Sequence, residues 1–193
     1  DTPVIDSISV ESSASEKPVY ICVTTHDNEP EPTYYKWSYR EIWEFNADLF
    51  ANAGYLNDKF YMFERHTSQN TYYCWGRDSS KVMLLATTDK LTENLIYEKK
   101  LIEIPRDHDK LKILYYIEVK QNRIRKGAYA YFENMQRNIE QAGSIFSPIP
   151  AEMRGNIVCV SDPKEWVLGY VDVTNTTIMK RFMPELRFIS GFL

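Results

Sequence analysis

The sequence has none of the short motifs that mark common catalytic and nucleotide-binding sites. It contains no G-x-S-x-G, no G-x-x-x-x-G-K-[ST], no H-E-x-x-H and no G-x-G-x-x-G. Its apolar runs, such as Val82–Ala86, are far shorter than the ~20 residues that a membrane-spanning helix requires. No secretory signal peptide stands at Asp1. We therefore expect no enzyme activity, no cofactor and no membrane span from these residues.

Cysteine and histidine are also scarce, and the positive charges are dispersed. Cys22, Cys74 and Cys159 allow one bridge plus a spare thiol, and no C-x-x-C spacing or flanking histidine suggests a reactive or metal-bound cysteine. The three histidines stand far apart in the sequence, so we expect no metal site. A net charge of −4 with both signs interspersed gives no basic stripe, which argues against nucleic acid as a partner.

The aromatic residues are abundant and follow a two-residue period. In Tyr34–Phe45 one face of the predicted strand carries Glu41 together with the aromatic residues Tyr35, Trp37, Tyr39, Trp43 and Phe45. Glu41 and Glu44 fall on opposite faces of such a strand, so they do not form a glycosidase pair. We expect Glu41 to be buried beside a partner, which could be Lys36, Arg40 or a tyrosine hydroxyl of a neighbouring strand.

Alternating segments separated by turn residues make up most of the chain. The predicted strands are Ile5–Val10, Val19–Thr24, Tyr34–Phe45, Lys59–Glu64, Tyr72–Gly76, Lys81–Thr87, Asn94–Ile104, Lys110–Gln121, Asn156–Ser161 and Trp166–Thr174. Asn94–Ile104 and Lys110–Gln121 flank the turn Pro105–Asp109 and are expected to form a hairpin-like pair. Because strands do not alternate with helices, the pattern favours a mainly β domain over residues 1–193, an antiparallel β-sandwich or a barrel-like fold.

A single amphipathic α-helix is predicted over Ala128–Ala142. Its apolar residues form one stripe, and Gly143 followed by two prolines ends the helix. We expect the helix to dock on the sheet through this stripe, which consists of Ala128, Phe132, Met135, Ile139 and Ala142.

Several segments, in their order and spacing, resemble a family of Bacteroidota surface lipoproteins known only as domain-of-unknown-function family 4249. These segments are Pro3–Ile8, Tyr34–Trp37 with Glu41–Phe45, Cys74-Trp75, Ala128–Phe132, Gln141–Phe146, Gly155–Cys159 and Val167–Tyr170. They cover most of the chain, and the block from Gly143 to Tyr170 is the most specific. The resemblance gives no catalytic residue.

The resemblance implies a location and a partner. Family members resemble one another in a lipobox signal peptide and an immunoglobulin-like domain ahead of the region that these segments span, so we expect this chain to be the C-terminal part of a longer, lipid-anchored protein of the outer-membrane surface. Their genes tend to neighbour TonB-dependent receptors, which implies an accessory, ligand- or partner-binding role in uptake. A hydrolase of extracellular polymers and a purely structural cell-surface domain remain the alternatives.

Two sets of site residues follow from an exported, partner-binding protein. Cys74 and Cys159 both lie in predicted strands and are expected to form a disulfide under oxidising conditions, while Cys22 stays a buried thiol. An accessory subunit must also expose aromatic side chains to its partner, and we predict Tyr34, Tyr72 and Tyr129 in this role.

Overall fold

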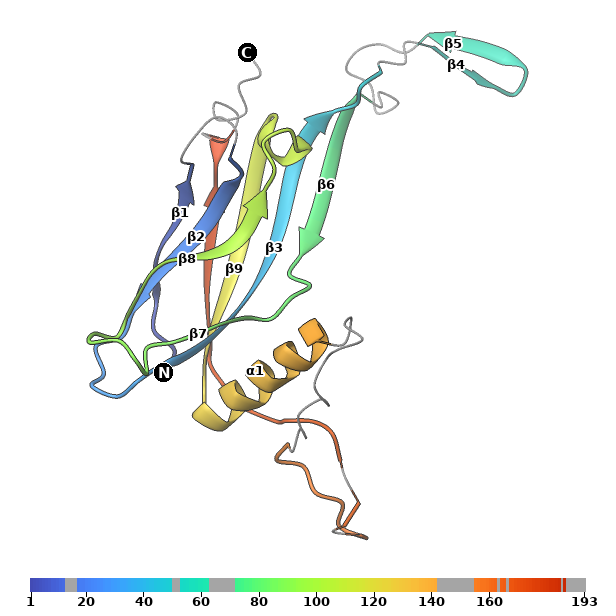
Figure 1. Ribbon diagram of the computed structural model, residues 1–193. Coiled ribbons are helices and arrows are strands. Elements are labelled where there is room, and N and C mark those ends of the chain that lie inside the picture. The colour runs from blue at the N-terminus through green and yellow to red at the C-terminus, as the bar shows by residue number, and fades with distance from the viewer. Residues whose placement is uncertain are drawn as a thin grey trace.

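The computed structural model describes residues 1–12, 17–49, 53–62, 72–141, 155–162, 164–165, 167–184 and 186, and its elements are named as in Figure 1. The strands are β1 (Ile5–Glu11), β2 (Val19–His26), β3 (Tyr34–Asn46), β4 (Ala53–Leu56), β5 (Lys59–Met62), β6 (Tyr73–Ser79), β7 (Leu84–Thr87), β8 (Leu95–Ile104), β9 (Leu114–Ile124) and β10 (Thr176–Phe182). The helix α1 spans Lys126–Gln141, and a short 3-10 helix, η1, spans Asp109–Leu111.

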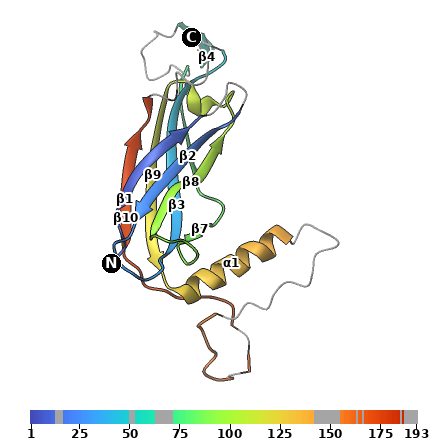
Figure 2. The same cartoon turned by 60° about the vertical axis from the view of Figure 1, so that its left-hand side comes forward.

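Two antiparallel sheets face each other in a β-sandwich. One sheet has the order β1-β2-β8, and the other has the order β10-β9-β3-β6, with β7 also paired to β3. β3 organises the second sheet because it is long enough to pair with β9 along one edge and with both β7 and β6 along the other. The predicted mainly β, antiparallel sandwich with one helix is confirmed (Figures 1 and 2).

The core lies between the two sheets and is built by the alternation seen in the sequence. Tyr35, Trp37 and Glu41 of β3 are buried, whereas Lys36 and Arg40 are not. Isoleucine and valine side chains of the facing sheet meet this aromatic face, as period-two burial requires. The core residues contributed by β1, β2 and β8 are Ile5, Ile8, Val19, Ile21, Val23, Ile96, Leu101, Ile102 and Ile104.

The predicted hairpin around Pro105–Asp109 is wrong. β8 pairs with β2 in one sheet, and β9 pairs with β3 and β10 in the other, so the connection crosses from sheet to sheet. His108 accepts a hydrogen bond at Nδ1 from the Lys110 backbone N–H at 3.1 Å and so caps η1 within this crossing. The alternation of apolar and polar residues identified the two strands, but it does not show with which other strands they pair.

The two strands predicted after the helix are also wrong. Residues 155–162 and 167–175 contain no strand within their described parts. Asn156 instead uses its side chain in place of a ladder: Nδ2 donates to the Val171 carbonyl at 2.7 Å, and Oδ1 accepts from the Val171 N–H at 2.8 Å. Among the described residues, the last strand of the sandwich is β10, which was not predicted from the sequence.

Helix α1 leaves the lower end of the sandwich at an angle, as Figure 2 shows. Ala128 is buried as predicted, and Tyr131, which was not part of the predicted stripe, is buried as well. Tyr131 lies 5.5 Å from Tyr170, ring to ring, and Lys36 Nζ lies 4.0 Å above the Phe132 ring. The predicted stripe is thus only partly docked.

The stripe becomes more exposed toward its far end. Phe132 and Met135 are half-buried, and Ile139 is 64% exposed. Ala142 and Gly143 lie outside the described residues. Among the described helices, none combines the length and the apolar character needed to cross a membrane.

Candidate functional site

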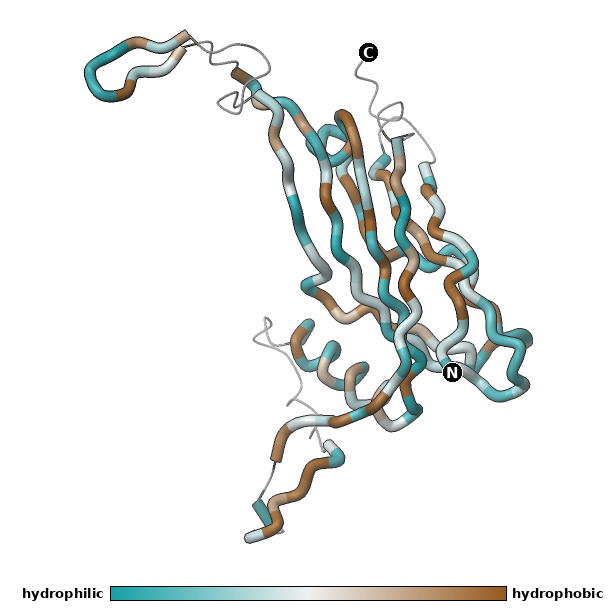
Figure 3. The backbone as a smooth tube through the Cα atoms, turned by 180° about the vertical axis from the view of Figure 1, so that it is seen from behind, coloured by the Kyte–Doolittle hydropathy of each residue, from teal (hydrophilic) through white to brown (hydrophobic). Residues whose placement is uncertain are grey.

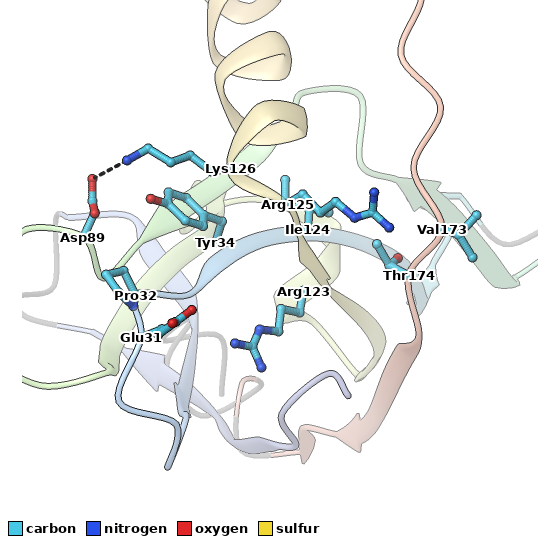
Figure 4. Close-up of a pocket in the computed structure, with 10 residues that line it drawn as sticks. All are labelled: Glu31, Pro32, Tyr34, Asp89, Arg123, Ile124, Arg125, Lys126, Val173 and Thr174. Carbon is cyan, nitrogen blue, oxygen red and sulfur yellow. Dashed lines mark ion pairs between the residues drawn. The ribbon is translucent and has the colours of Figure 1, made fainter. Parts of the chain in front are cut away.

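A cleft of about 550 Å³ opens where β9 passes into α1 (Figure 4). We call it the base cleft. Its walls come from the loop between β2 and β3, the start of β3, the turn after β7, the end of β9 and the chain before β10. The lining residues are Glu31, Pro32, Tyr34, Asp89, Arg123, Ile124, Arg125, Lys126, Val173 and Thr174.

Each cation of the base cleft is matched by a carboxylate. Arg123 pairs with Asp27 at 3.4 Å, Arg125 with Asp172 at 3.5 Å, and Lys126 with Asp89 at 3.9 Å. The dashed line in Figure 4 marks the last of these pairs. With its positive charges neutralised in this way, the cleft suits a small polar ligand of balanced charge better than a multiply charged anion.

Two carboxylates of the base cleft are the candidates for a catalytic pair if the protein were a hydrolase of extracellular polymers. Glu31 and Asp89 both line it, but both are exposed, and Asp89 is already paired with Lys126. A general acid needs a carboxyl group that its surroundings keep protonated, which enzymes achieve by removing it from water. These two exposed side chains therefore give no support to glycoside hydrolysis.

Two of the predicted aromatic residues contact each other beside the base cleft. The rings of Tyr34, at the start of β3, and Tyr129, in the first turns of α1, lie 5.3 Å apart. Both side chains are half-buried. Burial, with a smaller contribution from Glu133, raises the pKa of Tyr129 above its ordinary value. Residues distant in sequence are thus brought together, and Tyr34 lines the cleft itself.

The third predicted residue, Tyr72, lies elsewhere. It is half-buried, its ring is 5.3 Å from that of Tyr73, and its carbonyl accepts a hydrogen bond from the Ala47 N–H at 2.8 Å. This bond closes the base of the connection between β3 and β6, which we call the excursion. The predicted binding residues thus belong to two separate surfaces.

The excursion carries a hairpin of β4 and β5, residues 53–62, which we call the arm. Figure 1 shows it standing away from the sandwich at the end opposite α1. Asn57 and Asp58 form its two-residue turn, with φ of 50° and 58°, and this left-handed pair is the geometry of a type I′ turn. In Figure 3 the turn is hydrophilic and the strands behind it carry hydrophobic residues.

One face of the arm is apolar and uncovered by the described residues. The register pairs Tyr55 with Phe60 and Ala53 with Met62, which places these four side chains on the same face. Tyr55 is 61% exposed, Phe60 81% and Met62 75%. Near the root of the arm, Trp75 adds a further ring that is 62% exposed.

The arm was not predicted as a binding surface, although the sequence carries a signal for it. Of its two strands, only the second was predicted, within Lys59–Glu64. A two-residue Asn-Asp connection between Tyr55-Leu56 and Lys59-Phe60 is itself a hairpin signal, because Asn and Asp tolerate the left-handed backbone that the turn requires.

The predicted disulfide between Cys74 and Cys159 is absent, because the structure contains no bond between any of the three cysteines. β6, which carries Cys74, begins beside the arm at the upper end, whereas segment 155–162 lies below α1 (Figure 1). The prediction depended on a strand at Cys159 that does not form. Cys159 Sγ instead lies 3.2 Å from both Ser161 Oγ and Glu165 Oε2. Cys22 is buried, as predicted.

Glu41 is buried, as predicted, and its partners are Lys110 and Tyr115. Lys110 Nζ donates to Oε1 and the Tyr115 hydroxyl to Oε2, both at 2.5 Å. The tyrosine of a neighbouring strand was among the expected partners, but the cation comes from η1 instead of from Lys36 or Arg40. Across the described residues, no three His, Cys, Asp or Glu side chains gather in a way that could hold a metal ion.

Comparison with known proteins identifies a family but no characterised relative. No curated protein matches the chain, and no solved structure does so either. The family model described as Domain of unknown function (DUF4249) matches residues 1–179, which include every strand of the sandwich except the end of β10. The chain belongs to the DUF4249 family.

Proposed function

We propose that the chain is a non-enzymatic binding domain of a cell-surface lipoprotein, and that it serves as an accessory subunit of a TonB-dependent uptake system. In this proposal a lipid anchor belongs to a longer precursor and holds the domain at the outer membrane. Its partner is the TonB-dependent receptor. The domain contributes recognition, and the receptor performs transport.

The observation that carries the proposal is the uncovered apolar face of the arm. A two-stranded hairpin alone is marginally stable in water, and large exposed apolar patches usually mark interaction surfaces. Phe60 is the most exposed of the arm's aromatic residues, at 81%. The cost of presenting such a face to water is offset when a partner covers it.

The chemistry of the arm favours a protein partner over lipid. Its outermost residues, Asn57, Asp58 and Lys59, are polar or charged, and placing them in hydrocarbon would be costly. Tyr55 and Tyr61 behind them combine an apolar ring with a polar edge, a combination enriched at protein interfaces. Tyr72 lies at the root of the same excursion.

The test is capture of the receptor by the full-length lipoprotein in its native membrane. A Tyr55→Ser/Phe60→Ser variant should recover far less TonB-dependent receptor than the unaltered protein after mild crosslinking and affinity purification. The matched control is Val160→Ser, which alters an apolar residue that is 93% exposed and does not belong to the arm. Equal recovery by the arm variant, or no receptor recovered by the unaltered protein, would overturn the proposal.

A further inference from the structure

The incomplete docking of α1 leaves a groove beside its C-terminal half. The groove measures about 410 Å³, and it lies between this half of the helix and residues of β7 and β8. Ile139 forms the helix side. Val82, Met83, Leu84 and Leu85 form much of the opposite side, so half of the ten lining residues are apolar. This volume lies within the range of small-molecule sites.

Lysine side chains dominate the polar part of the groove. Lys81, Lys99 and Lys100 line it, against a single carboxylate, that of Glu140. Lys81 is paired with Asp78 at 3.1 Å and Lys100 with Glu11 at 3.2 Å, both outside the groove. With these two lysines already paired, Lys99 is the cation through which the groove favours an anionic ligand.

Lys99 is the cation best placed to receive such a ligand. It is half-buried, and it forms no ion pair with any residue in the described part of the chain. A half-buried charge without a counter-ion is unfavourable, and binding an anion relieves that cost.

A backbone irregularity directly precedes Lys99. Glu98 has φ of 46°, and the pairing register of β2 with β8 shifts between Val23 and Thr25, where β8 has an extra residue. Left-handed backbone at a non-glycine residue is uncommon, and β-bulges often redirect a side chain beside a binding site.

We propose that this groove binds an anionic amphiphile: a linear alkyl chain that lies along Ile139 and Val82–Leu85, with a carboxylate that pairs with Lys99. The groove is too small for a peptide helix, which is about 10–12 Å across with its side chains. A flexible hydrocarbon chain can instead lie against the apolar side chains of the groove, and Lys99 fixes the position of its charged end. This site is separate from the arm and does not depend on the proposed receptor.

The first experiment compares three ligands of equal chain length on the intact chain. Isothermal titration calorimetry should show that dodecanoate binds, that dodecanol binds more weakly, and that dodecyltrimethylammonium does not bind. Amide shifts on addition of dodecanoate should be centred on Val82–Leu85 and Gln136–Ile139. Equal affinity for the cationic ligand, or shifts centred elsewhere, would overturn the proposal.

Two variants assign the binding to the named residues. Lys99→Gln should weaken dodecanoate binding by about tenfold or more, because a hydrogen bond to a charged group is lost. Ile139→Asp, at a side chain that is already 64% exposed, should abolish binding without unfolding the domain. Lys120→Gln on the exposed face of β9 is the matched control and should bind normally. Unchanged affinity in the two folded groove variants would refute the site.

Light scattering tests whether a second copy of the chain, and not a small ligand, occupies the groove. If the groove were filled by a second copy of the chain, the protein would be dimeric without ligand, and Ile139→Asp would make it monomeric. That result would also overturn the proposal. A mass independent of Ile139 supports it.

Discussion

Lys110 Nζ and Glu41 Oε1 form an ion pair of 2.5 Å beneath η1, with Glu41 only 1% exposed. The second carboxylate oxygen accepts the Tyr115 hydroxyl, and Trp43 lies beneath the ammonium group, 4.9 Å from nitrogen to ring centroid. The burial of Tyr115, followed by the effect of Glu41, raises the pKa of its hydroxyl far above the ordinary value. The pair thus ties the connection that crosses between the sheets to β3.

The first prediction concerns Lys110→Ala. Removing the cation leaves Glu41 charged inside the sandwich, which should lower the free energy of unfolding by about 3–5 kcal/mol. The control is Lys112→Ala, because Lys112 pairs with Asp109 at the surface and should contribute about 0–1 kcal/mol. Urea denaturation measures both. Similar midpoints for the two variants would contradict the role assigned to the buried pair.

The second prediction tests the docking of α1. Ala128 is fully buried at the start of the helix, so Ala128→Asp should cost on the order of 3 kcal/mol or more in unfolding free energy. Ala130 is exposed two residues later, and Ala130→Asp should cost only a few tenths. Thermal melts followed by circular dichroism distinguish the two. A large loss in the second variant would mean that the helix is docked through another face.

These two sites show what the sequence could predict. Period-two alternation in β3 identified its buried face, including the burial of Glu41, because side-chain direction in a strand depends only on local geometry. The 3.6-residue period in the same way identified Ala128 as a docked residue. Lys110 could not be identified as the partner of Glu41, since that pairing depends on a crossing connection distant in sequence.

The main errors have a common cause. Asn156–Ser161 has the composition of a strand, but it pairs with no strand among the described residues, and Asn156 forms two side-chain hydrogen bonds to the backbone of Val171 instead. The docked helical stripe was predicted too long because periodicity gives the apolar face and not the length of sheet beneath it. Ile139 thus became part of a groove wall.

The third prediction concerns the thiols. Burial, with a smaller contribution from Glu11, raises the pKa of Cys22 to about 11, and the side chain is inaccessible, so it should not react with iodoacetamide at pH 8. Cys159 is only half-buried and should be alkylated in the folded protein. Mass mapping of the alkylated cysteines before and after unfolding measures the reactivity of both thiols. Because the structure has no disulfide, reducing agent should leave the melting temperature unchanged.

The fourth prediction is a pH dependence at the pair between β1 and β2. His26 Nδ1 lies 2.8 Å from Asp6 Oδ2 on the surface, and the hydrogen bond to Asp6, followed by the charge of Asp6, raises the pKa of His26 above its ordinary 6.5. A pKa that is higher in the folded protein than in the unfolded chain makes protonation stabilise the fold. The contribution of the His26–Asp6 pair to the free energy of unfolding is therefore fully present below the pKa that His26 has in the unfolded chain. It disappears as the pH rises through the pKa that His26 has in the folded protein.

Titration by NMR checks this prediction directly. The His26 ring signals should titrate above pH 6.5 in the unaltered protein, and Asp6→Asn should lower that pKa, since the variant removes the charge of Asp6 and weakens its hydrogen bond to the ring. Asp58→Asn, at an exposed carboxylate of the arm, is the control and should leave His26 unchanged. If Asp6→Asn leaves the His26 titration in place, the two side chains do not form this pair in solution, and the stability of the domain should then show no such change with pH.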